Sequence, residues 1–88
     1  ITPFVLYRPY EFIRNYINHE KIPVKLLGGG RDKDYGYLGF SHWAEDDKKV
    51  MSNFESIKSL WPENEEALDD ILDDYLFDNN PGYLNLSR

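Results

Sequence analysis

Residues 62–78 read PENEEALDDILDDYLFD, and the interpretation of the whole chain starts from this stretch. Its apolar side chains recur at steps of three and four residues between Ala67 and Leu76, which is the pattern of an amphipathic helix. Pro62 suits a first helical turn, and the glutamates that follow it favour the positive end of the helix dipole. The sequence therefore predicts a helix over residues 63–78.

This predicted helix is unusually acidic. It holds eight of the sixteen acidic residues, and no Lys or Arg lies between Lys58 and Arg88. Pairs such as Asp69/Asp73 place like charges four residues apart, each unfavourable by about 0.2–0.5 kcal/mol. Asp is also a poor helix former. Because stability does not account for these acids, we interpret them as a surface for a partner; a solvated face without a partner is the alternative.

The spacing of the charges points to the kind of partner. Sixteen helical residues span about 24 Å, which gives roughly one charge per 3 Å, close to the phosphate spacing of about 3.4 Å along one DNA strand. We predict that carboxylates of this helix stand in for phosphates in a basic groove, and that three acids earlier in the chain form a second patch. The predicted helix residues are Glu63, Glu66, Asp69, Asp70, Asp73, Asp74 and Asp78, and the second patch is Glu45, Asp46 and Asp47.

Composition limits the other possibilities. The 88 residues predict one domain, 1–88, and 41% hydrophobic with 16% aromatic residues is typical of a folded chain. The net charge of −6 disfavours direct binding of nucleic acid or of an anionic membrane. There is no Cys, no secretory leader pattern and no run of transmembrane length, so we expect a cytoplasmic protein without disulfides.

The remaining chain predicts an α+β fold, a small antiparallel sheet covered by helices. Residues 22–27 and 35–40 flank a Gly-rich loop, which is typical of a hairpin. Strands are predicted at 2–7, 22–27, 35–41 and 83–86, and helices at 9–20, 45–60 and 63–78. The predicted core is Phe4, Leu6, Phe12, Ile13, Ile17, Val24, Leu26, Leu38, Phe40, Val50, Phe54, Ile57, Leu68, Ile71, Leu72 and Tyr75.

No motif for catalysis, metal or cofactor binding stands out. Gly28–Arg31 lacks the Lys-Ser/Thr of a phosphate-binding loop, and a calcium loop starting at Asp32 would have Trp43 where the terminal Glu belongs. His19 and His42 belong to no recognisable triad motif. We therefore expect no cofactor, no metal and no enzymatic activity.

The opening TPFVLYRPYEFIRNYI and the acidic ENEEALDDILDDYLFD, in a small Cys-free chain, resemble the phage-encoded DNA-mimic anti-restriction proteins, in particular the Arn type of T-even phages. The resemblance implies a homodimer in the host bacterial cytoplasm. Its acidic surface would occupy the DNA site of a McrBC-type endonuclease of the host. Two alternatives remain: an immunity or antitoxin protein that masks a basic nuclease, and a phage modulator of transcription or CRISPR machinery that binds by groove packing.

Overall fold

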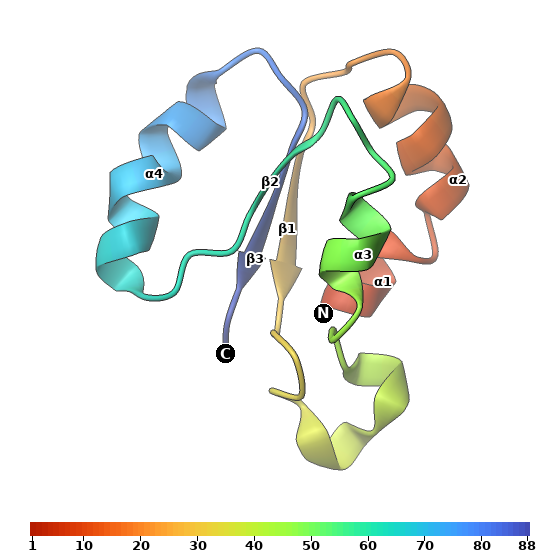
Figure 1. The fold of residues 1–88 in the computed structure, drawn as a ribbon, viewed down its shortest axis with the longest axis vertical. Helices are drawn as coiled ribbons and strands as arrows, with labels where there is room; N and C mark the ends of the chain where they lie inside the picture. Colours follow the sequence, from red (N-terminus) through yellow and green to blue (C-terminus); the bar gives the residue numbers. More distant parts are fainter.

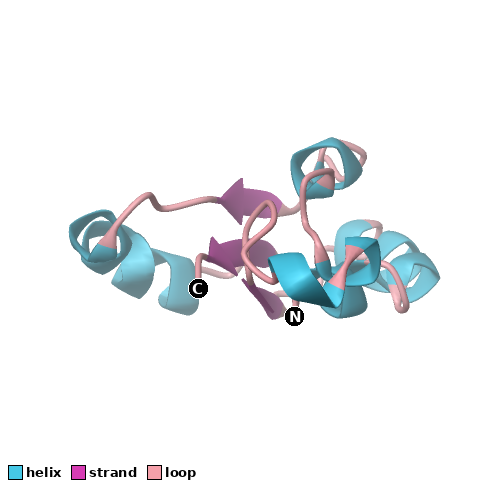
Figure 2. Ribbon diagram, turned by 90° about the horizontal axis from the view of Figure 1, so that it is seen from below, coloured by secondary structure: helices cyan, strands magenta, loops and turns pink.

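The computed structural model describes all residues, 1–88, as three layers (Figures 1 and 2). A sheet of three strands forms the middle layer. One long helix covers one face of the sheet, and the shorter helices cover the other. In chain order the elements are α1 (Thr2–Leu6), α2 (Tyr10–Phe12), the π-helical η1 (Ile13–Asn18), β1 (Lys25–Gly29), the 3₁₀ turns η2 (Gly36–Leu38) and η3 (Phe40–His42), α3 (Asp47–Met51), β2 (Lys58–Leu60), α4 (Glu65–Phe77) and β3 (Gly82–Leu86).

The sheet is entirely parallel, so the predicted antiparallel sheet is wrong. Its order is β1-β3-β2, with Lys25 and Lys58 both paired with Gly82 at the start of β3. Parallel neighbours need a crossover rather than a tight turn. Helix α4 is the crossover from β2 to β3, and the turns and α3 carry the chain from β1 to β2 (Figure 1).

The predicted hairpin fails because residues 35–41 form no strand. They make two 3₁₀ turns joined at Gly39, whose φ of 87° favours glycine. Leu38 and Phe40, both predicted in the core, are exposed instead. The Gly-rich segment is also not a hairpin loop, since Gly28 and Gly29 lie within β1 and pair with β3.

Residues 2–7 were expected to be a strand and are the helix α1. Pro3 suits a first helical turn, and a short apolar run without strict alternation fits either state. Tertiary contacts select the helix. Leu6 is fully buried, and the Thr2 hydroxyl, also buried, donates a hydrogen bond to the Gly30 carbonyl at 2.8 Å.

Of the helix predicted at 45–60, only the part that forms α3 is helical. The last three residues of the predicted range form β2 instead. Phe54 and Ile57 are buried as expected, although neither is helical. The turn between α3 and β2 is held by Asn18, whose Oδ1 accepts a hydrogen bond from the Ser56 amide at 2.9 Å. The apolar residues in this segment are spaced as in a helix, but those after α3 are buried from a turn and from the residue just before a strand.

Other elements confirm the prediction. Residues 9–20 contain α2 and η1, β1 overlaps 22–27 with a shift toward the C-terminus, and β3 and α4 lie where expected. Of the predicted core, Leu6, Ile13, Ile17, Phe54, Ile57 and Tyr75 are buried, whereas Phe12 is exposed. The core on the α1 side also includes Met51 and Tyr83.

The sheet has two different faces. Side chains alternate along a strand, so Tyr83 and Asn85 of β3 point toward α1 while Gly82 and Leu84 point toward α4. Gly82 is required at that position, because a Cβ there would lie 2.5 Å from the Tyr75 ring. None of the helices combines the length and hydrophobicity that a membrane crossing requires.

Candidate partner-binding surface

Helix α4 begins at a defined cap. The side chain of Asn64 accepts a hydrogen bond from the Ala67 amide at 2.8 Å, which satisfies one of the unpaired amides of the first turn. Glu65 and Glu66 follow in that turn, next to the positive end of the dipole. The helix therefore starts two residues later than predicted, because Asn64 rather than Pro62 sets its boundary.

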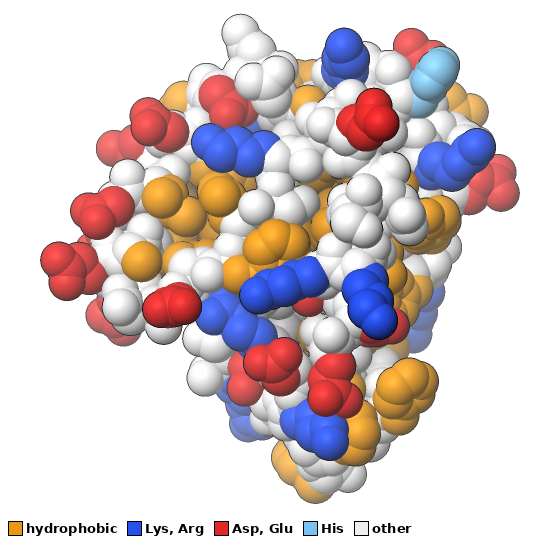
Figure 3. Space-filling view, viewed as in Figure 1, with side chains coloured by type: hydrophobic (Ala, Val, Ile, Leu, Met, Phe, Trp, Pro, Cys, Tyr) orange, Lys and Arg blue, Asp and Glu red, His pale blue; other side chains and the backbone are white.

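The acidic residues of α4 point away from the sheet. Figure 3 shows acidic side chains along the outer side of this helix, at the left of the view. The protein has one ion pair, Lys25–Asp78, so no other acid of this region lies within ion-pair distance of a cation. We call the following exposed residues the acidic face: Glu63, Glu65, Glu66, Asp69, Asp70, Asp73 and Asp74.

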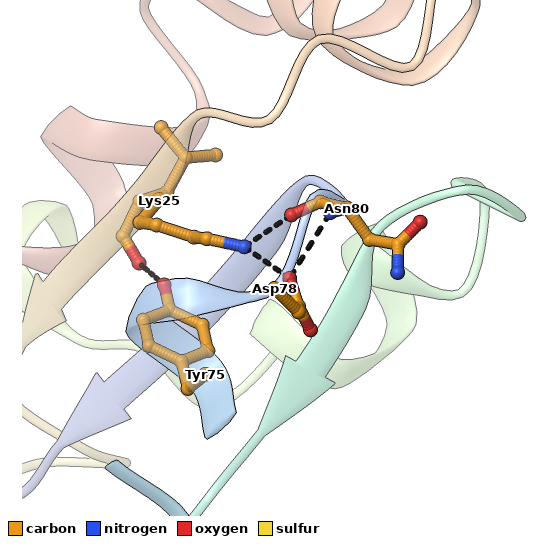
Figure 4. Close-up of polar contacts among 5 residues, drawn as sticks. Lys25, Tyr75, Asp78 and Asn80 are labelled. Atoms are coloured by element: carbon orange, nitrogen blue, oxygen red, sulfur yellow. Dashed lines mark hydrogen bonds and ion pairs between the residues drawn. The ribbon is translucent and has the colours of Figure 1, made fainter. Parts of the chain in front are cut away.

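Buried contacts fix the opposite side of α4. Tyr75 is 1% exposed, and its hydroxyl donates a hydrogen bond to the Leu26 carbonyl at 2.8 Å (Figure 4). Burial raises the pKa of the Tyr75 hydroxyl to about 12, so it stays protonated and remains a donor at neutral pH. This contact joins the helix to β1 and holds the acidic face outward.

Asp78, predicted as a phosphate mimic, has an internal partner instead. Its Oδ1 lies 2.5 Å from the Lys25 ammonium and accepts a hydrogen bond from the Asn80 amide at 3.0 Å (Figure 4). The bond from Lys25 holds the pKa of the Asp78 carboxyl below its usual value. Asp78 therefore anchors the end of α4 to β1 and does not belong to the unpaired acidic face.

The predicted second patch is not a continuous surface. Asp47 is only 4% exposed, and Oδ2 accepts hydrogen bonds from the Trp61 indole at 2.8 Å and the Tyr83 hydroxyl at 3.0 Å. Asp46 accepts a hydrogen bond from the Tyr7 hydroxyl at 2.5 Å, and Glu45 is exposed. We therefore remove Asp47 from the candidate site. The other two lie beside α3, on the side of the sheet away from α4 (Figure 1).

Burial and the carboxylate of Asp47 both affect the ionisation of Tyr83, whose hydroxyl donates to Asp47. Desolvation raises the pKa of the Tyr83 hydroxyl, and the charge of Asp47 raises it further. The hydroxyl therefore remains a donor to Asp47, and this buried carboxylate keeps two hydrogen-bond donors. Asp47 has a structural role, because a buried charge needs such partners.

An aromatic side chain that was not predicted from the sequence lies exposed beside the acidic face. Phe77 is 80% exposed, and it lines a hollow of about 380 Å³ together with Asp73, Asp74 and Asp78. Residues three and four apart share one side of a helix, so the positions of Asp73 and Asp74 already place Phe77 beside them. This spacing would have allowed the position of Phe77 to be predicted from the sequence. Glu65, exposed in the first turn, also joins the acidic face although the predicted set omitted it.

No group of three or more His, Asp or Glu side chains comes together in a way that could hold a metal ion. His42 packs edge-on against the Phe4 ring at 5.0 Å, and its Nδ1 lies 2.9 Å from the Ser41 hydroxyl. No family model, curated protein or solved structure matches this chain, so the resemblance to DNA-mimic proteins stays a prediction.

Proposed function

We propose that this protein is an inhibitor that inserts the acidic face of α4 into the DNA-binding site of a basic protein. The observation that carries the proposal is a row of exposed carboxylates without cationic partners on one rigid helix. The resemblance noted above favours a host restriction endonuclease of the McrBC type as the target.

The charge density supports this proposal after Asp78 has been removed from the set. The six acids from Glu65 to Asp74 occupy ten helical residues, or about 15 Å at 1.5 Å per residue. That is roughly one charge per 2.5 Å, compared with about 3.4 Å along one DNA strand. A groove of Lys and Arg that binds phosphates would meet a comparable field.

Rigidity makes such a helix an effective competitor. The Asn64 cap holds its first turn, and the Tyr75 and Asp78 contacts hold its last turns. The carboxylates are thus positioned before binding, so less conformational entropy is lost than with a disordered acidic tail. The negative field also speeds association with a basic surface at low salt.

Phe77 favours a second candidate function within the same binding mode. An exposed aromatic ring beside Asp73 and Asp74 offers an apolar or cation–π contact to a particular protein surface. General phosphate mimicry does not require this ring. A protein-specific mask of one basic nuclease, as in immunity proteins, would use it.

A capture experiment with charge-matched variants tests the proposal. The parent protein is immobilised, incubated with bacterial lysate, and its bound proteins are identified by mass spectrometry. One variant changes Asp69, Asp70, Asp73 and Asp74 to Asn. The control neutralises four exposed acids outside the acidic face, Glu11, Glu20 and Glu55 to Gln and Asp32 to Asn, and so has the same net charge.

We expect the parent and the control to capture the same DNA-binding protein, and the α4 variant to lose it. Equal capture by all three proteins would show that the acidic face is only a solvated surface. Equal loss in both variants would assign binding to net charge instead of to α4.

A further inference from the structure

A polar hollow of about 420 Å³ lies between η1 and the turn that follows α3. Arg14, Asn15, Asn18 and His19 form one wall, and Asn53 forms the other. None of these side chains is apolar and none is acidic, in a chain whose net charge is −6. The lining of this hollow is therefore rich in hydrogen-bond donors and free of carboxylates.

The π-helical geometry of η1 gathers the first wall. The His19 amide donates to the Arg14 carbonyl at 3.2 Å, five residues back, which widens the turn relative to an α-helix. Residues four and five apart, such as Arg14, Asn18 and His19, then lie on one side. Turns of this kind are rare in proteins, and those that occur are often found at functional sites.

Hydrogen bonds within the protein fix the second wall. The side-chain Nδ2 of Asn53 donates to the Tyr10 hydroxyl at 3.2 Å, and the backbone amide of Ser56 donates to Asn18 Oδ1 at 2.9 Å. Both contacts join the turn after α3 to the N-terminal helical segment. The two walls are therefore held in a fixed relation before any ligand arrives.

On the η1 wall, the internal contacts of Asn15 and Asn18 use their side-chain oxygens and leave their nitrogen donors, whereas Asn53 on the other wall uses its own nitrogen to bind Tyr10. Asn15 Oδ1 accepts from the Arg14 guanidinium at 2.8 Å, and Asn18 Oδ1 accepts from Ser56. The amide nitrogens of both asparagines, the remaining guanidinium donors and the His19 ring have no partner in the protein. The backbone carbonyls at the end of η1 do not repel an anion strongly, because they already accept hydrogen bonds from amides of the following turn. These carbonyls are those of Arg14, Tyr16, Ile17 and Asn18.

We propose that this hollow binds the phosphate group of a small phosphomonoester. A guanidinium has a planar fork of donors that matches a phosphate, and amide donors complete the coordination of its oxygens. The absence of apolar lining excludes the usual hydrophobic ligand. The volume exceeds what one phosphate needs, so it accommodates the polar body of a sugar phosphate. The site is separate from the acidic face and independent of the proposed function.

Isothermal titration calorimetry on the whole chain tests the site with ribose 5-phosphate, inorganic phosphate and ribose. The main variant is Asn18→Asp. Its carboxylate still accepts the Ser56 amide but replaces the donor that faces the hollow with a negative oxygen. Asn64→Asp is the matched control, because it adds the same charge at the cap of α4, where Asp serves equally well. Arg14→Gln is a second variant, with exposed Arg8→Gln as its control.

We expect ribose 5-phosphate to bind at millimolar concentration or below and ribose not to bind. Asn18→Asp and Arg14→Gln should each weaken binding about tenfold or more, since each loses a hydrogen bond to a charged group. Both controls should bind as the parent does. Inorganic phosphate binding in competition with ribose 5-phosphate would also support the site. No heat with either phosphate, equal binding of ribose, or unchanged binding in folded Asn18→Asp and Arg14→Gln would overturn the proposal.

Discussion

The ammonium group of Lys25, on β1, lies 2.5 Å from Oδ1 of Asp78, the residue that follows and caps α4. The same ammonium group lies 5.5 Å from the centre of the Tyr75 ring and donates to the Asn80 carbonyl. Lys25 thus joins the first strand to the last turn of the acidic helix and to the turn before β3. This connection determines where the unpaired acidic face ends.

Replacing Asp78 with Asn should lower stability at neutral pH but not in acid. The pKa of the Asp78 carboxyl is below its ordinary value of 3.8 in the folded protein. Its stabilising contribution is therefore complete above pH 3.8 and is lost as the pH falls through the lower, folded-state value. Urea unfolding at several pH values should show curves for parent and variant that converge in acid. Asp74→Asn, which removes an unpaired charge, should show no loss at neutral pH; a loss equal to that of Asp78→Asn would contradict the role of the ion pair.

Gly82→Ala should destabilise the contact between α4 and the sheet. The new Cβ would lie 2.5 Å from a carbon of the buried Tyr75 ring, and that ring is held by its bond to the Leu26 carbonyl. Overpacking of this kind costs about 1–3 kcal/mol in the free energy of unfolding. Gly29→Ala, in β1, has no atom within 4 Å of its new Cβ and serves as the control. Equal free energies of unfolding for the two variants, measured in urea, would contradict the packing.

Asp47→Ala should lower stability without a direct effect on the acidic face. The change leaves the Trp61 indole and the buried Tyr83 hydroxyl without their acceptor. Two donors left without a partner cost on the order of 3 kcal/mol. Asp46→Ala is the control, since its one partner, Tyr7, is more accessible to water. If Asp47→Ala retains parental stability but loses the captured partner, Asp47 belongs to the binding surface after all.

We also expect the protein to be a homodimer. A chain of 88 residues forms a modest core, and large apolar side chains such as Phe12, Tyr16 and Leu27 are each half exposed or more. A two-fold pair would bring two copies of the acidic face into one assembly. Light scattering at tens of micromolar should give twice the monomer mass. The monomer mass under these conditions would contradict this expectation.

Local signals allowed α4 to be predicted and nonlocal contacts limited the rest. The spacing from Ala67 to Leu76 specifies a helix with one apolar side wherever it packs, so its exposed acids follow from sequence alone. Strand direction is different, because pairing of β1 with β3 joins residues more than fifty positions apart. The exposed apolar residues Leu38 and Phe40 then supported a hairpin that does not form.

The candidate site shows the same division. Asp73 and Asp78 are both acids of the same predicted helix, and the sequence does not distinguish them. Only the fold brings Lys25 next to Asp78. Asp47 resembles its neighbours Glu45 and Asp46, yet it is buried by Trp61 and Tyr83 from two distant segments. Phe77, in contrast, was predictable, because its spacing from Asp73 and Asp74 is local.

Competition by duplex DNA is the best test of whether the acidic face occupies the partner's DNA-binding site. The captured partner is bound to a fluorescent duplex, and the loss of anisotropy is followed as this protein is added at low and at higher salt. We predict that the parent displaces the duplex. Raising the salt should weaken its binding to the partner steeply, and the variant with Asp69, Asp70, Asp73 and Asp74 changed to Asn should fail to displace the duplex. A ternary complex in which duplex and protein bind the partner together, or equal displacement by that variant, would show that the carboxylates of α4 do not take the place of DNA phosphates.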